Sequence, residues 1–320
     1  MDETLIYSFK VHQKVDPTHT TVLRNAFARD MARRFKSLIR SIKIGVVDRD
    51  VFGLSSGANA LGTFITQQVV IPDPGAFAFP RSSDKIAAFM RWLEAQVEAE
   101  MLTVGEFEQI GAAIESAWTN KYILESYKRG ISRSRSEMKK SGFDIPSIAV
   151  SGGVDIVAGL PMHVDRLGVL YTRVFSELKG ITSQMDQQIS RILAQGIADG
   201  DNPRLLARKL VAAIDGTGAG KLGITDSLGR YIPAARRAEL LARTEVIRAH
   251  HQGMVQEYMN WRVEGVTLQA EWKTAGDHRV CERCEIYEGE TFTLEEAMNM
   301  IPLHPLCRCI ALPYRKEWYA

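Results

Sequence analysis

The chain has 320 residues, of which 45% are hydrophobic, and a formal net charge of +2. This length predicts two domains with a sizeable core, and the near-neutral charge leaves any contact with nucleic acid to a local patch. The longest uncharged run, residues 51–72, is too rich in glycine and polar residues for a membrane span, which needs about 20 mainly apolar residues. No signal pattern follows Met1. We therefore expect no membrane contact, and synthesis in a cytoplasm.

A first helix is predicted over residues 17–44. Its apolar positions recur three and four residues apart, as on one helix face, and are Phe27, Met31, Phe35, Leu38 and Ile42. A basic stripe is offset by two residues and therefore lies opposite; it consists of Arg29, Arg33, Lys36, Arg40 and Lys43. Two interpretations of this stripe stay open: a solvated face, or a docking surface for a phosphate backbone or an acidic partner protein.

An irregular stretch follows this helix. Residues 45–81 are rich in glycine and proline and nearly free of charge, which predicts an irregular connection or a short hairpin. The Ser-Ser-Asp sequence at residues 82–84 predicts the N-terminal cap of a helix that begins near Lys85.

A second long helix is predicted over residues 104–140. Thr103 and Glu106 have the spacing of a capping box, and Gly130 marks a point where the helix could be interrupted. Glycine and proline are then frequent in residues 141–161. We expect the boundary of a helical N-terminal region, residues 1–160, at this point.

Residues 161–265 predict a long helical arm. A helix is expected over residues 163–199, and Asn202-Pro203 predicts the start of another that ends at Gly216. The glycine-rich segment after it is not a P-loop, because it lacks the first glycine and the final serine or threonine of that pattern and because no strand precedes it. We therefore expect a flexible loop over residues 216–221.

The last helix of the arm is predicted over residues 234–262. Leu240, Thr244, Ile247, His251, Met254, Tyr258 and Trp261 form its inward face. Glu245 and Arg248 are three residues apart, which predicts a structural ion pair on the flank of that face. His251 is expected to be a core histidine.

Residues 266–320 predict a small α+β module. Residues 266–273 alternate between apolar and polar, as in a half-buried strand; a short helix is expected over 294–300 and a last strand over 308–313. The fold class expected for the whole chain is mainly α, with a small C-terminal α+β module closed by a Cys/His cluster.

All four cysteines lie between Cys281 and Cys309, which favours a metal site over a disulfide framework. Cys281 and Cys284 have the spacing of a metal knuckle, and His304 and Cys307 repeat it. Cys281, Cys284 and Cys307 are the expected ligands of a zinc ion. The fourth is Cys309, if a strand over 308–312 turns both cysteines to one face, or His304, if Cys309 is buried in the core.

Structural zinc is the expected cofactor, with disulfide pairing of the same cysteines as the alternative. A segment of about 50 residues has a marginal hydrophobic core, and a bound metal supplies stability to such modules. A catalytic zinc needs an open ligand position, and no HExxH motif occurs. We therefore expect no enzymatic activity; a hydrolase or transferase that uses Glu245, Arg248 and His278 is a third hypothesis.

The ordered signature resembles the phage Mu F-like head morphogenesis (minor head protein) family. It comprises Ala242-Arg243-Thr244-Glu245 with Arg248, Trp272, Asp277-x-Arg279-x-Cys281-x-x-Cys284, Gly289 and His304-Pro305-x-Cys307-Arg308-Cys309. The resemblance covers about residues 165–315 and departs from the family at Leu306, where relatives often have Asn. Residues 1–160 resemble no family that we recognise.

The resemblance implies a minor structural protein of a tailed-phage head. Such a protein is assembled in the bacterial cytoplasm, is present in several copies per virion and contacts the portal, the capsid interior or packaged DNA. Roles in head morphogenesis and in DNA packaging or delivery would follow, with residues 1–160 as the contact region. The alternative is a zinc-stabilised nucleic-acid-binding protein that is not tied to a virion.

Overall fold

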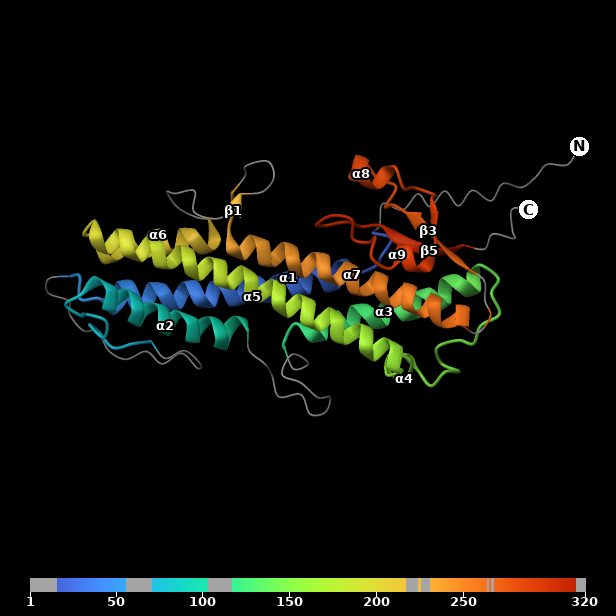
Figure 1. The fold of residues 1–320 in the computed structure, drawn as a ribbon, viewed down its shortest axis with the longest axis horizontal. Coiled ribbons are helices and arrows are strands. Elements are labelled where there is room, and N and C mark those ends of the chain that lie inside the picture. Colours follow the sequence, from blue (N-terminus) through green and yellow to red (C-terminus); the bar gives the residue numbers. More distant parts are fainter. Residues whose placement is uncertain are drawn as a thin grey trace, which may run out of the picture. The chain divides into compact units, whose positions relative to one another are not determined.

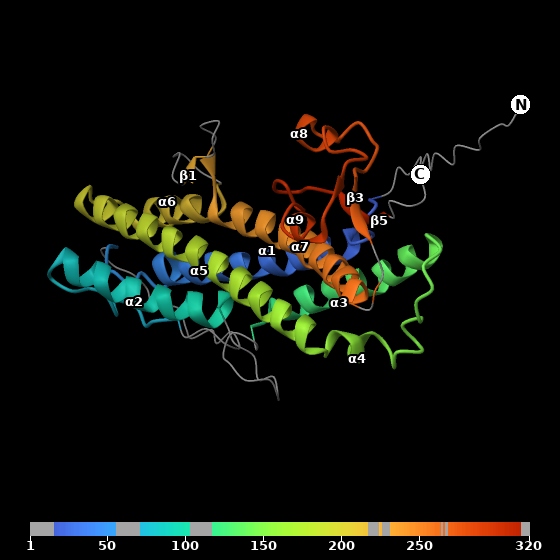
Figure 2. The same ribbon diagram turned by 45° about the vertical axis from the view of Figure 1, so that its right-hand side comes forward.

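The computed structural model describes residues 16–55, 71–102, 117–216, 224–225, 231–263, 265 and 268–314 (Figures 1 and 2). Contacts between backbone positions divide the chain into two compact units. Unit 1 consists of residues 1–25, 121–170 and 243–320, and unit 2 of residues 26–120 and 171–242. The bounds expected from the sequence, at 160 and 265, differ from these because each unit is built from chain segments that are far apart in sequence.

In unit 2, helix α1 (Thr21–Lys43) has the predicted amphipathic pattern. Phe27, Met31, Phe35, Leu38 and Ile42 are all at most 1% exposed. The five basic residues of the opposite face are all exposed. A π-helical turn, η1 (Ile44–Asp48), continues α1 and packs against helix α6 (Pro203–Asp215).

The start of helix α2 (Ser82–Met101) differs from the expected one. Its N-cap is Arg81, which makes no side-chain capping bond, so residues 82–84 form its first turn instead of its cap. Helix α6 begins and ends as predicted: the side chain of Asn202 accepts a hydrogen bond from the Leu205 amide (3.0 Å), and Gly216 is left-handed. A short hairpin, β1 (Ile224–Thr225) with β2 (Tyr231–Ile232), follows α6.

Unit 1 includes helix α3 (Asn120–Lys140), the short α4 (Val154–Ala158) and the first part of α5 (Pro161–Ala198). The helix expected from residue 104 begins only at Asn120; the predicted capping box and residues 104–116 lie outside the described residues. Gly130 does not interrupt α3.

Helix α7 (Ala234–Val263) crosses α3 at two glycines within unit 1. A Cβ atom at Gly130 would overlap the backbone carbonyl of His250, and one at Gly253 would overlap that of Tyr127. The two backbones are therefore in direct contact. The predicted inward face of α7 is buried except at its two ends, where Leu240 and Trp261 are half-buried. Residues on its other faces are buried too, including Val246, Ala249 and Val255. A helix whose middle is buried on more than one face is a central element of its unit.

The C-terminal module is a three-stranded antiparallel sheet with short helices. The strand order is β4 (Thr291–Phe292), β3 (Gln269–Lys273), β5 (Ile310–Tyr314), and α8 (Glu282–Glu285) and α9 (Leu294–Ala297) complete it. Side chains at Ala270 and Trp272 of β3 share a buried cluster with Met254 and Tyr258 of α7. The mainly helical chain with a small C-terminal α+β module is confirmed.

Residues 141–153 connect α3 to α4 inside unit 1. No point in residues 141–161 separates the two units, because side chains on both sides of this segment bind the same partners. Arg135 of α3 and His163 of α5 both contact Glu257 of α7. Within the described residues, no helix combines the length and the apolar composition that a membrane span requires.

Candidate metal centre

Cys281 and Cys284 lie on one tight turn. Cys281 is the N-cap residue of α8, and its carbonyl accepts hydrogen bonds from the amides of Cys284 (2.9 Å) and Glu285 (3.0 Å). This turn places the two sulfur atoms together, as the two-residue spacing predicted. Cys284 is buried, whereas Cys281 is half-buried.

His304 and Cys307 lie on a second turn. The Cys307 amide donates to the His304 carbonyl (3.1 Å), and Leu306 between them has a φ of 64°. The amide of Leu306 also donates to the hydroxyl of Thr244 on α7 (3.4 Å). The second turn is thus attached to the central helix of unit 1. Leucine adopts a positive φ less readily than Asn or Gly, so the backbone at Leu306 is strained.

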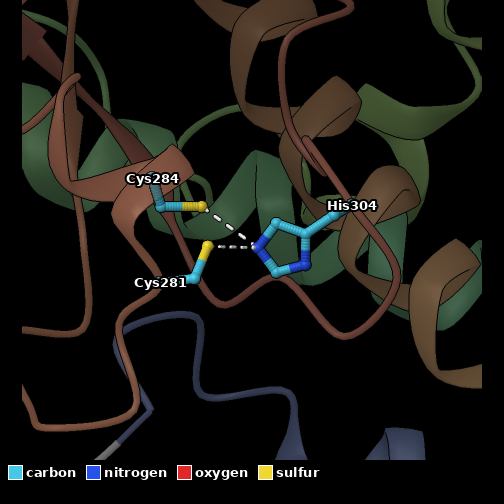
Figure 3. Close-up of side chains that lie close together, drawn as sticks. All are labelled: Cys281, Cys284 and His304. Atoms are coloured by element: carbon cyan, nitrogen blue, oxygen red, sulfur yellow. Dashed lines mark hydrogen bonds between the residues drawn. The ribbon is translucent and has the colours of Figure 1, made fainter. Parts of the chain in front are cut away.

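The two turns meet through the imidazole of His304. Its Nε2 atom is 3.2 Å from the Sγ atoms of both Cys281 and Cys284 (Figure 3). The Sγ atoms of Cys284 and Cys307 are 3.9 Å apart. Around a tetrahedral zinc ion, two sulfur ligands are about 3.8 Å apart and a sulfur and a nitrogen about 3.6 Å. These three separations are close to those of a tetrahedral site, and each of the two sets of three donors described next could ligate an ion.

The five donors form two groups of three that share Cys284. One group is Cys281, Cys284 and His304, and the other is Cys284, Cys307 and Cys309; within each group all donor atoms lie within 4.8 Å of one another. All four cysteines are free, and the 3.9 Å between Cys284 and Cys307 is far longer than a disulfide bond of about 2.05 Å. The alternative of disulfide pairing is not seen in this structure.

Cys307 and Cys309 do not lie on a strand, so strand alternation does not turn them to one face. Strand β5 begins only at Ile310, so Cys307 and Cys309 lie in the loop before it. Their thiols nevertheless interact: hydrogen bonding from Cys309 lowers the pKa of Cys307 to about 5, and the same bond raises the pKa of Cys309. Burial raises the pKa of Cys284 to about 12. Of Cys284, Cys307 and Cys309, Cys307 is thus the one whose thiolate this environment favours.

An ion pair joins the two cysteine-bearing segments. Both carboxylate oxygens of Asp277 accept from the guanidinium of Arg308, at 2.6 and 2.8 Å, and Arg308 stands between Cys307 and Cys309. Asp277 also accepts from the backbone amide and side chain of Arg279. Hydrogen bonding from Arg308 holds the pKa of Asp277 well below its usual range. Sequence spacing gave Asp277 and Arg308 no role beyond the family resemblance.

The predicted pair on α7 is formed. Glu245 is 2% exposed and lies 3.1 Å from Arg248. His251 is also buried, with its Nε2 atom 2.7 Å from the Ala297 carbonyl of α9, and burial lowers its pKa to about 4. His278, the third residue of the hydrolase hypothesis, is exposed on the loop before Cys281.

A buried polar network in unit 1 was missed by the sequence analysis. Glu257 accepts from Arg135 (2.6 Å) and Trp261 (2.9 Å) and contacts His163 (3.0 Å), which in turn contacts the Tyr127 hydroxyl (3.0 Å). These contacts lower the pKa of Glu257 against the effect of its burial. The signal in the sequence was a glutamate next to the core residue Tyr258. Because Tyr127, His163 and Glu257 are completely buried, we interpret the network as structural.

Comparison with known protein families finds a match over residues 187–312, to the family described as Phage Mu protein F like protein. The C-terminal part of the chain is thus similar to this family. No curated protein and no solved structure matches the chain significantly. The Mu F-like part includes all five candidate metal ligands, α7 and the sheet. Its family suggests a phage head-related protein and thus a place in the virion.

Proposed function

We propose that this protein is a minor structural protein of a tailed-phage head, associated with the portal or the capsid interior. Its role would be in head morphogenesis and in DNA packaging or delivery. The observation that carries the proposal is that residues 187–312 match the Mu F-like family and that the ordered Cys and His positions of this segment lie close together in space.

We further propose that the Cys/His cluster holds one structural zinc ion. One donor group, Cys281, Cys284 and His304, would provide two sulfur ligands and one nitrogen ligand, and Cys307 of the other group would provide a third sulfur. The bound metal would link the two turns, and it would require thiolates at the ligating cysteines. Cys309 in place of His304 is the other possible set.

A structural role fits the surroundings of the cluster better than a catalytic one. A catalytic zinc keeps an open position beside an acid or base. Here five donors compete for four positions, and the nearby Glu288 is hydrogen-bonded to the Thr274 amide (2.6 Å). We expect the protein to have no enzymatic activity.

Mass spectrometry of purified virions tests the head assignment. Particles of the phage that encodes this chain, banded in a density gradient, should contain it in several copies per particle, with the major capsid protein as the reference. The content of this protein in empty capsids from the same lysate is measured as well, so that particles with and without DNA are compared. Absence from both kinds of particle would contradict the proposal and favour the zinc-stabilised nucleic-acid-binding protein.

A further inference from the structure

A concave basic surface lies in unit 2, outside the Cys/His cluster. It is a cavity of about 500 Å³, lined by Lys43, Val47, Asp48, Arg204, Ala207, Arg208 and Val211. Lys43 ends α1, and Arg204 and Arg208 lie on α6; these parts of α1 and α6 appear at the left of both Figures 1 and 2. The lining therefore combines three cations and one carboxylate with the aliphatic side chains of Val47, Ala207 and Val211.

The charges in this cavity are unfavourable in the isolated chain. Arg204 lies in the first turn of α6, where the helix dipole disfavours a cation, and no acidic residue shares that turn. Arg208 follows four residues later, so the two like charges are neighbours on the helix surface. The nearby Asp201 pairs with Lys209 (2.5 Å) and not with either arginine. A bound anion would relieve both repulsions.

The cavity continues into the exposed face of α1 through Lys43. The 17 residues between Asp30 and Asp48 include no acidic residue and five cations, namely Arg34 and the four stripe residues Arg33, Lys36, Arg40 and Lys43. Arg33 pairs with Asp30 (2.6 Å), but among described residues no ion pair involves Arg29, Lys36, Arg40, Lys43, Arg204 or Arg208. From Arg29 to Lys43 the helix extends about 21 Å, the length of about six base pairs.

We propose that these six cations form one binding surface for the phosphate backbone of double-stranded DNA. A row of exposed cations along a helix matches a row of phosphates, whereas an acidic protein would need a surface whose carboxylates repeat at the same spacing. Recognition of this kind is independent of sequence, because no base is read. The inference is independent of the head proposal, since purified chain is used to test it and virions to test the other.

The test is fluorescence anisotropy with a labelled 20-base-pair duplex, from 50 to 200 mM NaCl. Six phosphate contacts give a slope of log affinity against log salt of at most about −5. The double variant Arg204→Gln/Arg208→Gln removes two contacts, so its slope should be less negative by about 1.8. Wild-type protein should accordingly lose about tenfold more affinity than the variant across this salt range. Arg40→Gln should change the slope by about half as much.

Two controls keep the outcome unambiguous. Arg91→Gln/Arg191→Gln removes the same charge from exposed positions of unit 2 that do not line the cavity, and should leave the slope unchanged. Poly-glutamate of matched charge serves as an acidic-protein probe and should compete poorly. Equal effects of the two double variants, an unchanged slope for Arg204→Gln/Arg208→Gln, or tighter binding of poly-glutamate than of DNA would each overturn the proposal.

Discussion

At the scale of single residues, Asp277 is the side chain that joins the two halves of the candidate metal site. Its paired hydrogen bonds to Arg308 fix the segment of Cys307 and Cys309 next to the loop that leads to Cys281. This arrangement orients the donors before any metal binds. Groups that orient metal ligands in this way typically change affinity by 10- to 100-fold when they are removed.

Asp277→Asn should therefore weaken zinc binding by about 10- to 100-fold, because the neutral amide cannot hold both guanidinium nitrogens. Zinc affinity is measured by competition with a chromophoric chelator, and the absorption of bound Co²⁺ reports whether the ligand set is kept. The spectrum should be unchanged while the affinity falls.

A second bidentate pair in unit 1 provides the control. Glu295 and Arg262 are joined by two hydrogen bonds on the surface, and neither residue is among the candidate ligands. Glu295→Gln should leave zinc affinity as in the wild type. Equal affinities for Asp277→Asn and wild type would show that Asp277 does not position the site.

The residues of the site were predictable and their arrangement was only partly so. Spacing alone indicated Cys281, Cys284, Cys307, His304 and Cys309, because the donors of a metal knuckle are separated by two intervening residues. The choice between His304 and Cys309 rested on a strand that begins two residues later than expected. Strand ends depend on pairing with β3, which one sequence segment does not reveal.

At the scale of elements, the crossing of α3 and α7 shows packing overriding helix propensity. Alanine usually stabilises a helix over glycine by about 1 kcal/mol. At Gly253, however, a Cβ atom would lie 2.5 Å from the Tyr127 carbonyl oxygen, so the helices would have to separate. Gly130 was expected as a point of interruption, because a single helix pattern does not show which helix will cross it.

Gly253→Ala should lower the free energy of unfolding by about 1–3 kcal/mol, as overpacked cores do. Gly180→Ala is the matched control, since Gly180 is also helical and nothing lies within 4 Å of a Cβ built there. It should raise the free energy of unfolding by up to about 1 kcal/mol. Urea denaturation measures both, and a stabilised Gly253→Ala protein would show that the two backbones are not in close contact.

The helices themselves were predicted well where an apolar face repeats. For α5, α6 and α7 the predicted ends lie within about two residues of those observed, because caps such as Asn202 and Gly216 are local signals. The cap of α2 was misplaced by three residues, since Ser82 and Ser83 suit a cap as well as a first turn. Burial of α7 on more than one face was missed because it depends on partners from other segments.

At the scale of the whole molecule, removal of zinc should act on one unit. The module over residues 268–314 shares a core with α7 in unit 1. Once the bound ion is removed, this module should loosen while unit 2 keeps its structure. Hydrogen exchange with and without a chelator measures this, and exchange should rise at residues 277–309 and stay constant in α1 after Phe27. Cys284→Ser should show the same exchange as protein from which a chelator has removed the metal, because Cys284 belongs to both donor groups. Unchanged exchange, with no zinc by elemental analysis, would contradict the zinc proposal.

The interleaving of the two units limits how the molecule can be dissected. A recombinant fragment cut at the ends of the family match, residues 187–312, would retain Glu257 but lose both Arg135 and His163. An orphaned buried carboxylate is costly, by about 3–5 kcal/mol when one partner of a pair is removed. The ends of the family match are therefore not the ends of an independently folding fragment. The ends of an expressed fragment of this protein have to be chosen so that these tertiary contacts are kept.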